Sequence, residues 1–395
     1  MKKTELTRRL AQDPVPGETE AAQRAWRIVG SFYAGRERVR RPQRRLRPII
    51  ALALLAAAAA VAVTPPGRAV VEKFRDAVGR NEAEPALVRL PAPGFLLIDS
   101  THGPWVVHRD GSKRLLGTYT AASWSPRGLF VVATRGTDVV TLEPGGKVHW
   151  TVSREHAVTD ARWAPSGFRI AYREGTTLRV VVGDGTGDRL LARGVAPVAP
   201  AWRPRPSAVN VVAYAAGDGV VHVVDVDTGH ELWRTSPGPP VRQLVWSGRS
   251  LLVLSRSGAT LYDGRHRVAG HIDVPHGNLL LDAAFGPKRG GLVYADFDPN
   301  TGHTELIRNE CAGATGPCLA IAPQAIFRSA GRLEQLAWSP DERWLLVTWP
   351  SADQWLFLRM PGVRRLLTVS SVTAQFDPSG TGPRTFPSIA GWCCS

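Results

Sequence analysis

One short sequence motif, which we call the repeat phrase, recurs seven times between residues 121 and 392. In each copy, small and apolar residues alternate and the motif ends on an aromatic residue. The successive aromatic positions differ by 39, 39, 44, 39, 53 and 54 residues. A period of about 40–50 residues with one aromatic per unit is typical of β-propellers, in which each repeat forms one blade. The seven repeat aromatics are Trp124, Trp163, Trp202, Trp246, Phe285, Trp338 and Trp392.

The two ends of the repeat region complement each other. Residues 94–118 contain three strand-like stretches without the phrase, whereas Ser388–Trp392 supplies the phrase without its strands. Together they complete one four-stranded blade, which would close the ring and leave no sheet edge unpaired. We therefore predict an all-β, seven-bladed β-propeller over residues 94–395. Six or eight blades would also fit, because the wide spacings around Phe285 and Trp338 leave room for an irregular unit.

The phrase also carries a family resemblance. Trp124-Ser-Pro-Arg-Gly128 and Trp338-Ser-Pro-Asp-Glu342 resemble the repeat of TolB-like and WD-type propellers, in which an apolar strand ends in Trp-Ser-Pro before a turn. The resemblance covers about three quarters of the chain. It implies the fold and leaves the ligand open, since such propellers serve many unrelated functions.

A narrower resemblance concerns the outer strands. Val224–Arg234 looks like the outer-strand motif of quinoprotein-like propellers, and Leu142–Trp150 is a degenerate copy of it. The resemblance implies a tryptophan on the outer hairpin, Trp150 or Trp233, that interlocks neighbouring blades. We expect blade packing from these residues and no bound cofactor.

An apolar run precedes the repeats. Residues 49–63 contain no polar side chain, and the segment 48–66 approaches the thickness of a membrane as a helix. Seven arginines lie between residues 36 and 47, so the positive-inside rule places the N-terminus in the cytoplasm and exports everything after Pro66. There are two alternatives for this segment. It could be a cleaved signal peptide, with Ala60-Val-Ala62 as the small-residue cleavage site, or a helix buried in the protein core.

In residues 1–47, before the apolar run, the spacing of the apolar residues predicts one amphipathic helix. Trp26, Val29 and Phe32 lie on one face of it, and arginines occupy much of the remainder. This face would dock onto a cytoplasmic partner, or the basic helix would lie on the anionic inner leaflet. Residues 67–93 predict a short juxtamembrane helix followed by a proline-rich linker.

The charge is unevenly distributed. The chain carries a formal net charge of +15, and residues 1–47 contribute 13 Lys/Arg against 5 Asp/Glu, a net +8. The repeat region shows neither a basic stripe nor an aromatic stacking motif, so we expect no nucleic-acid partner.

Catalytic motifs are missing from the sequence: it has no G-x-S-x-G elbow, H-E-x-x-H or P-loop. His271 and His276 could ligate a metal, but polar loop residues explain them better. Asp296–Gly302 resembles a calcium loop, although its glycine is the seventh residue rather than the sixth, and a long hairpin turn is the simpler interpretation. We expect no enzyme activity, cofactor or metal.

All four cysteines follow the apolar run, where export would permit oxidation. Cys311 and Cys318 flank a short loop and predict a disulfide. Cys393 and Cys394 are adjacent, and three outcomes stay open: a bond to each other, a bond elsewhere, or free thiols.

These patterns predict a single-pass bacterial membrane protein whose exported propeller binds a protein or cell-envelope ligand without catalysis. The alternative is a signalling regulator. A cytoplasmic helix, one span and an exported sensor resemble the layout of membrane-bound anti-sigma factors, although residues 1–47 lack a zinc motif of the H-x-x-x-C-x-x-C kind. In that case the cytoplasmic partner would be a sigma factor.

Overall fold

The computed structural model describes residues 89–204, 210–288, 291–310, 323–377 and 385–394. All of them belong to the unit Gly67–Ser395. The expected tail helix with Trp26, Val29 and Phe32, the apolar segment 48–66 and the juxtamembrane helix lie outside the described residues. Within the described part, the helices are the single turns η1 (Pro350–Ala352) and α5 (Val372–Gln375), and neither could span a membrane.

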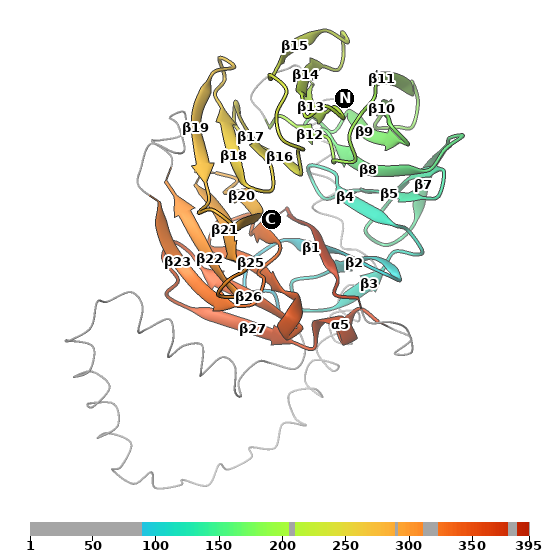
Figure 1. The fold of residues 1–395 in the computed structure, drawn as a ribbon. Coiled ribbons are helices and arrows are strands. Elements are labelled where there is room, and N and C mark those ends of the chain that lie inside the picture. The colour runs from blue at the N-terminus through green and yellow to red at the C-terminus, as the bar shows by residue number, and fades with distance from the viewer. Residues whose placement is uncertain (1–88, 205–209, 289–290, 311–322, 378–384, 395) are drawn as a thin grey trace, which may run out of the picture. The chain divides into compact units, whose positions relative to one another are not determined.

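Seven antiparallel sheets of four strands each surround a common axis, which confirms the all-β propeller (Figure 1). We number the blades from the first complete repeat. Blade 1 comprises β4 (Ala121–Trp124), β5 (Val131–Arg135), β6 (Asp138–Leu142) and β7 (Val148–Ser153); blade 2 comprises β8 (Val158–Trp163), β9 (Arg169–Glu174), β10 (Thr177–Val182) and β11 (Arg189–Arg193); blade 3 comprises β12 (Ala201–Trp202), β13 (Val211–Ala215), β14 (Val221–Asp225) and β15 (Glu231–Arg234).

The remaining blades repeat this order. Blade 4 comprises β16 (Gln243–Ser247), β17 (Ser250–Leu254), β18 (Gly258–Tyr262) and β19 (Val268–Asp273); blade 5 comprises β20 (Leu279–Phe285), β21 (Leu292–Asp298), β22 (His303–Asn309) and β23 (Gln324–Ala330); blade 6 comprises β24 (Leu336–Trp338), β25 (Trp344–Trp349), β26 (Gln354–Arg359) and β27 (Leu366–Ser370); blade 7 comprises β28 (Ser388–Cys393), β1 (Phe95–Ser100), β2 (Gly103–Val107) and β3 (Lys113–Leu115).

Blade 7 is built from both ends of the repeat region, as predicted. Leu96 of β1 pairs with Trp392 of β28, and Leu97 pairs with Gly391. The described ring therefore has seven blades rather than six or eight. The two wide spacings come from long connections: residues 310–323 join β22 to β23, and residues 371–387, which include α5, join blade 6 to blade 7.

The core consists of the layers between neighbouring blades. Every residue of β13 is buried, because both faces of a middle strand are covered, whereas the outer strand β7 alternates between exposed and half-buried residues. Large buried side chains such as Trp355, Phe357 and Tyr172 fill these layers. Burial on both faces explains why the middle strands are runs of Val, Leu and Ala instead of alternating patterns.

The first strand of each blade contacts the first strands of its neighbours and is therefore innermost. All seven repeat aromatics lie near the ends of these strands. Three of the tryptophans join one blade to the preceding one: Nε1 of Trp202, Trp246 and Trp338 donates to the carbonyl oxygens of Arg162, Ala201 and Ala284 at 2.8, 3.1 and 3.2 Å, respectively. Each acceptor directly precedes the aromatic of the previous blade.

The expected interlock of the outer hairpins is also present. Trp150 of β7 donates from Nε1 to the carbonyl oxygen of Gly183 in blade 2 at 3.0 Å. Trp233 of β15 stacks on His266 of blade 4, with ring centroids 4.9 Å apart, and contacts Tyr262 of the same blade. Both tryptophans thus connect adjacent blades at their outer strands.

Candidate functional site

The strand order divides the connections of the ring between two faces. On the first, which we call the crossover face, each blade leads to the next and the second strand turns into the third. On the second, the hairpin face, the first strand turns into the second and the third into the fourth. A ligand approaching along the axis therefore meets different loops at each end.

One cavity, with a volume of about 680 Å³, lies on the axis at the crossover face. The starts of the inner strands β16, β20, β24 and β28 form its walls. Its polar lining includes Arg242, Gln243, Asp282, Glu334, Gln335 and Ser388.

A second cavity of about 390 Å³ borders β8, β12 and β16 and shares Arg242 and Gln243 with the first. We refer to the two together as the axial cavity. The walls of the axial cavity are inner strands. Each of them is hydrogen-bonded to the second strand of its own blade and contacts the inner strands of the neighbouring blades. The polar groups therefore lie on a rigid frame, as a binding site requires.

Asp282 lies in the wall of the axial cavity, between blades 5 and 6. Its Oδ2 accepts the backbone N–H of Leu336 at 2.8 Å, and its Oδ1 accepts that of Ala283 at 2.8 Å. Burial raises the pKa of the Asp282 carboxyl to about 6, although these N–H groups, the Gln243 side chain and the nearby Arg242 oppose the shift. The guanidinium of Arg242 donates to the Leu280 carbonyl oxygen at 3.1 Å and so spans blades 4 and 5.

Asp99 makes the corresponding contact between blades 7 and 1. Its Oδ2 accepts the backbone N–H of Ala122 at 3.3 Å, and its Oδ1 is buried without a partner among the described residues. Burial raises the pKa of Asp99 to about 6, against the opposing effects of that N–H and of Arg162. Burial also lowers the pKa of Arg162, and the charges of Asp160 and Asp99 oppose this.

The rim of the axial cavity carries charges of both signs. Arg332 Nε lies 3.6 Å from Glu334 Oε1, and both side chains are about half exposed. The side chains of Leu281 and Phe386 add apolar surface beside them. Paired charges, amides, hydroxyls and apolar patches together suit a ligand with mixed polarity, such as an extended peptide segment.

His271 and the calcium-like loop have local partners. His271 Nδ1 lies 3.3 Å from the Thr260 hydroxyl, and Asp298 accepts the backbone N–H of Asn300 and the hydroxyl of Thr301, both at 2.8 Å. Residues 299–302 form the turn between β21 and β22, so the hairpin interpretation holds for this segment. Across the described ranges, no three His, Cys, Asp or Glu side chains are grouped to hold a metal ion.

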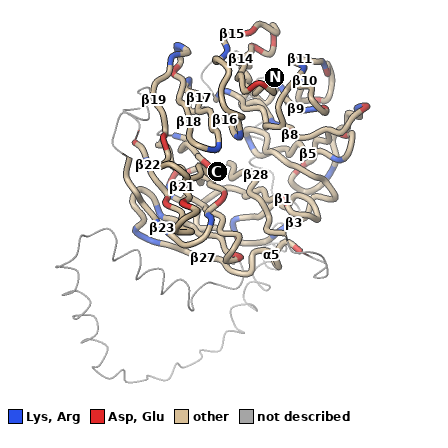
Figure 2. The backbone as a smooth tube through the Cα atoms, in the orientation of Figure 1, with Lys and Arg blue, Asp and Glu red and all other residues tan. Residues whose placement is uncertain are grey.

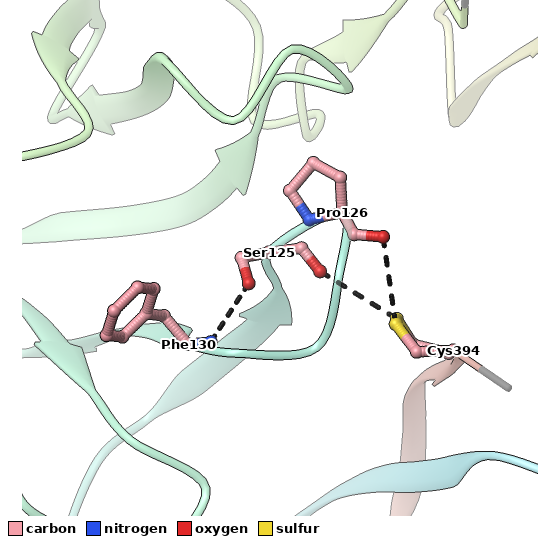
Figure 3. Close-up of a disulfide and its surroundings, with 5 residues drawn as sticks. Ser125, Pro126, Phe130 and Cys394 are labelled. Carbon is pink, nitrogen blue, oxygen red and sulfur yellow. Dashed lines mark hydrogen bonds between the residues drawn. A yellow bond between two sulfur atoms is a disulfide. The ribbon is translucent and has the colours of Figure 1, made fainter. Parts of the chain in front are cut away.

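Cys393 and Cys394 are bonded to each other at the end of β28. Figure 3 shows Cys394 beside Ser125 and Pro126. The Sγ atoms lie 3.7 Å from the carbonyl oxygens of Ser125 and Pro126, respectively, in the first turn of blade 1. This disulfide lies beside the axis on the hairpin face, opposite the mouth of the axial cavity. Cys311 and Cys318 lie outside the described residues, so their disulfide stays a prediction.

Two of the repeat aromatics, Trp163 and Trp202, line the smaller part of the axial cavity, whereas its polar lining residues were not predicted from the sequence. A signal was available, because polar residues recur three positions before the aromatic in four repeats: Asp160, Gln243, Asp282 and Gln335. The last three of these residues line the axial cavity. No such signal marks Asp99, because it lies on the second strand of blade 7 instead of an inner strand. Its contact with Ala122 of blade 1 arises only when the two blades pack together.

No family model and no curated protein matches the chain. Solved structures do match: Kluyveromyces lactis Hsv2 has a TM-score of 0.51 at 10% identity over 70% of this chain and 94% of Hsv2. Kuenenia stuttgartiensis hydrazine synthase has a TM-score of 0.48 at 15% identity over 71% and 80%. The β-propeller domain of Myceliophteria thermophila Cps50 (Swd1) has 0.48 at 15% identity over 63% and 85%. Identities this low show the fold alone, and the chain is a seven-bladed β-propeller.

Proposed function

We propose that this protein is a membrane-anchored, exported binding module that holds a protein or cell-envelope ligand at the mouth of the axial cavity without catalysing a reaction. The observation that carries this proposal is the axial cavity itself, which combines paired charges, amides and apolar side chains on rigid inner strands. TolB-like propellers, which the Trp-Ser-Pro repeats resemble, are consistent with such a role. The anchor rests on the apolar segment 48–66 and its arginine-rich flank.

Site-specific crosslinking in the native bacterium tests the binding surface. A photo-crosslinking amino acid at Glu334, on the rim of the axial cavity, should capture one discrete partner. The matched control is the same amino acid at Arg265, in the β18–β19 turn of the hairpin face. Equal capture from both positions, or none from Glu334, would contradict the proposal.

Export can be tested independently. A cysteine introduced at Arg265 should react with a membrane-impermeant maleimide in intact cells, because the propeller follows the predicted span. A cysteine introduced at Thr4, in the tail, should react only after the cells are broken. Labelling of the tail in intact cells, or protection of the propeller, would reverse the expected topology.

The signalling regulator is a second candidate, favoured by the amphipathic pattern of the tail. Affinity capture with residues 1–47 from a native lysate should then recover a sigma factor or another transcription regulator. Replacing Trp26 and Phe32 by Ala should abolish this recovery, because both lie on the apolar face of the predicted helix. Recovery of membrane lipid alone would leave the tail as part of the anchor.

A further inference from the structure

A separate cleft of about 440 Å³ opens on the hairpin face between blades 5 and 6. Its walls are formed by Gly286, Lys288 and Gly291 between β20 and β21, by the β24–β25 turn and by the ends of β22 and β26. We call it the inter-blade cleft. It lies at the opposite end of the blades from the axial cavity and shares no lining residue with the 680 Å³ part of it.

Four cations from both blades line the inter-blade cleft: Lys288, Arg308, Arg343 and Arg359. Charges of both signs are distributed around the ring in Figure 2, so this convergence is local rather than part of a broad basic face. Arginines from two blades facing one cleft would repel each other in the absence of an anion. Their placement therefore favours a negatively charged ligand.

Arg308 is partly buried in the inter-blade cleft. Its side chain is 20% exposed, and its Nη1 lies 3.0 Å from Glu310 Oε1. Its Nε, however, is buried and has no hydrogen-bond partner among the described residues. A buried N–H normally has an acceptor, so this donor is suited to an oxygen of a ligand in the inter-blade cleft.

Arg359 approaches from the other blade. Its guanidinium carbon lies 5.4 Å from the centre of the Trp344 ring, and a cation held over a ring face has a restricted orientation. Within the described ranges, Arg359 forms no ion pair with a carboxylate. Its planar fork is thus available for a tetrahedral or planar oxyanion.

The acidic residues of the cleft are engaged in holding its turns. Asp341 Oδ1 accepts the Ser339 hydroxyl at 2.6 Å and the backbone N–H of Arg343 at 3.1 Å, and Glu342 Oε1 accepts the backbone N–H of Lys288. Asp341 Oδ2 lies 4.0 Å from Arg343 Nε, at the limit of an ion pair. These carboxylates fix the walls of the cleft and only partly neutralise its arginines.

We propose that the inter-blade cleft binds a phosphate group, with Arg308 and Arg359 as its main donors and Arg343 at the opening. A phosphate oxygen would accept the unpartnered Nε–H of Arg308, and the forked guanidinium of Arg359 would bind two further oxygens. Phosphate fits better than a carboxylate because its oxygens can face donors from both blades at once. This site goes beyond the proposed function, which uses the other face.

The phosphate can belong to a free small molecule or to a lipid headgroup. The hairpin face is also where the chain enters the propeller: the N–H of Leu90 donates to the Arg109 carbonyl oxygen of blade 7, and Gly94 packs beside Pro340 of blade 6. The segment that follows the predicted membrane span therefore reaches the same face as the inter-blade cleft. The experiment below separates the two sources.

The test uses the full chain in neutral dodecyl maltoside micelles. Inorganic phosphate is titrated by calorimetry, and retention of dioleoylphosphatidylglycerol is measured by native mass spectrometry with dioleoylglycerol, which has no phosphate, as the reference lipid. The variant Arg308→Gln/Arg359→Gln removes the main donors. Arg265→Gln, an exposed arginine in the blade 4 turn of the same face, is the matched control.

We expect each lost arginine to weaken phosphate binding about tenfold or more, with Arg265→Gln unchanged. Calorimetric binding of inorganic phosphate would identify a free phosphate ligand, whereas selective retention of phosphatidylglycerol alone would identify a headgroup. Binding of neither probe, or unchanged binding in the double variant, overturns the proposal. If the double variant melts at a lower temperature, Arg343→Gln replaces it, because that side chain is 68% exposed, and its binding must also be weaker.

Discussion

The Oδ2 atom of Asp282 in blade 5 accepts the backbone N–H of Leu336 in blade 6, with the two atoms 2.8 Å apart. The next junctions repeat this contact: Gln335 Oε1 accepts the N–H of Ile389 at 2.7 Å, and Asp99 Oδ2 accepts that of Ala122 at 3.3 Å. Polar side chains therefore join blades 5, 6, 7 and 1 near the axis. Two of these contacts run between inner strands, and the third runs from β1, the second strand of blade 7, to the inner strand of blade 1.

The raised pKa values of Asp99 and Asp282 predict a stability that depends on pH. Both carboxyls titrate near pH 6 in the folded protein and near pH 3.8 when unfolded, so between these values the folded state holds protons that the unfolded state has lost. Their contribution to stability is therefore full below about pH 4 and is lost as the pH rises through about 6. Asp282→Asn should flatten this slope.

Urea unfolding of wild-type protein and Asp282→Asn between pH 4.5 and 7.5 measures the difference directly. Asp110→Asn, whose carboxylate lies in an exposed turn and has a lowered pKa, is the control and should leave this part of the slope unchanged. Parallel curves for wild type and Asp282→Asn would show that Asp282 does not titrate in this range.

The tryptophans of the inner strands allow a matched comparison. Trp246→Phe removes the hydrogen bond to the Ala201 carbonyl oxygen and keeps most of the ring, so it should lower the free energy of unfolding by about 1 kcal/mol beyond the packing loss. Trp163→Phe loses no such bond, because Nε1 of Trp163 is buried without a described acceptor. Chemical denaturation of both variants gives the difference, and equal losses would assign no net value to the inter-blade bond.

We expect the pairing of β28 with β1 to hold the ring closed, and we expect the Cys393–Cys394 disulfide to contribute little to closure. Deleting residues 388–395 exposes the edge of β1, and we expect aggregation that light scattering detects. The variant Cys393→Ser/Cys394→Ser keeps the strand and should unfold at nearly the wild-type urea concentration, since a bond between adjacent residues restricts the unfolded chain little. Aggregation of the serine variant as well would mean that the sulfur atoms are needed for closure.

Gly94 should tolerate no side chain. Its φ is +101°, and an added Cβ would lie 2.4 Å from the Cys393 carbonyl oxygen and 2.7 Å from that of Cys394. Gly94→Ala should therefore destabilise the protein by clearly more than the roughly 1–2 kcal/mol that left-handed backbone alone costs a non-glycine residue. Gly136→Ala, with φ of +58° and open space around the Cβ, should cost only that amount. Similar melting temperatures for the two variants would argue against the close approach at Gly94.

The repeat phrase by itself determined the propeller, the positions of the inner strands and the blade shared by the two ends. It could do so because each blade must bury the same two faces, which imposes one residue pattern at one spacing. The blade count needed the structure, since the long connections at 310–323 and 371–387 lengthen the period without adding a blade.

Only the tertiary structure decided which polar side chains meet. Asp99 and Ala122, or Arg308 and Arg359, lie on different blades, and no local pattern relates them. Their approach follows from strand register, blade twist and ring closure, which bring residues distant in sequence to one axis or one cleft. The repeat phrase specifies the propeller fold, whereas the contacts between polar side chains of different blades depend on how the blades come together.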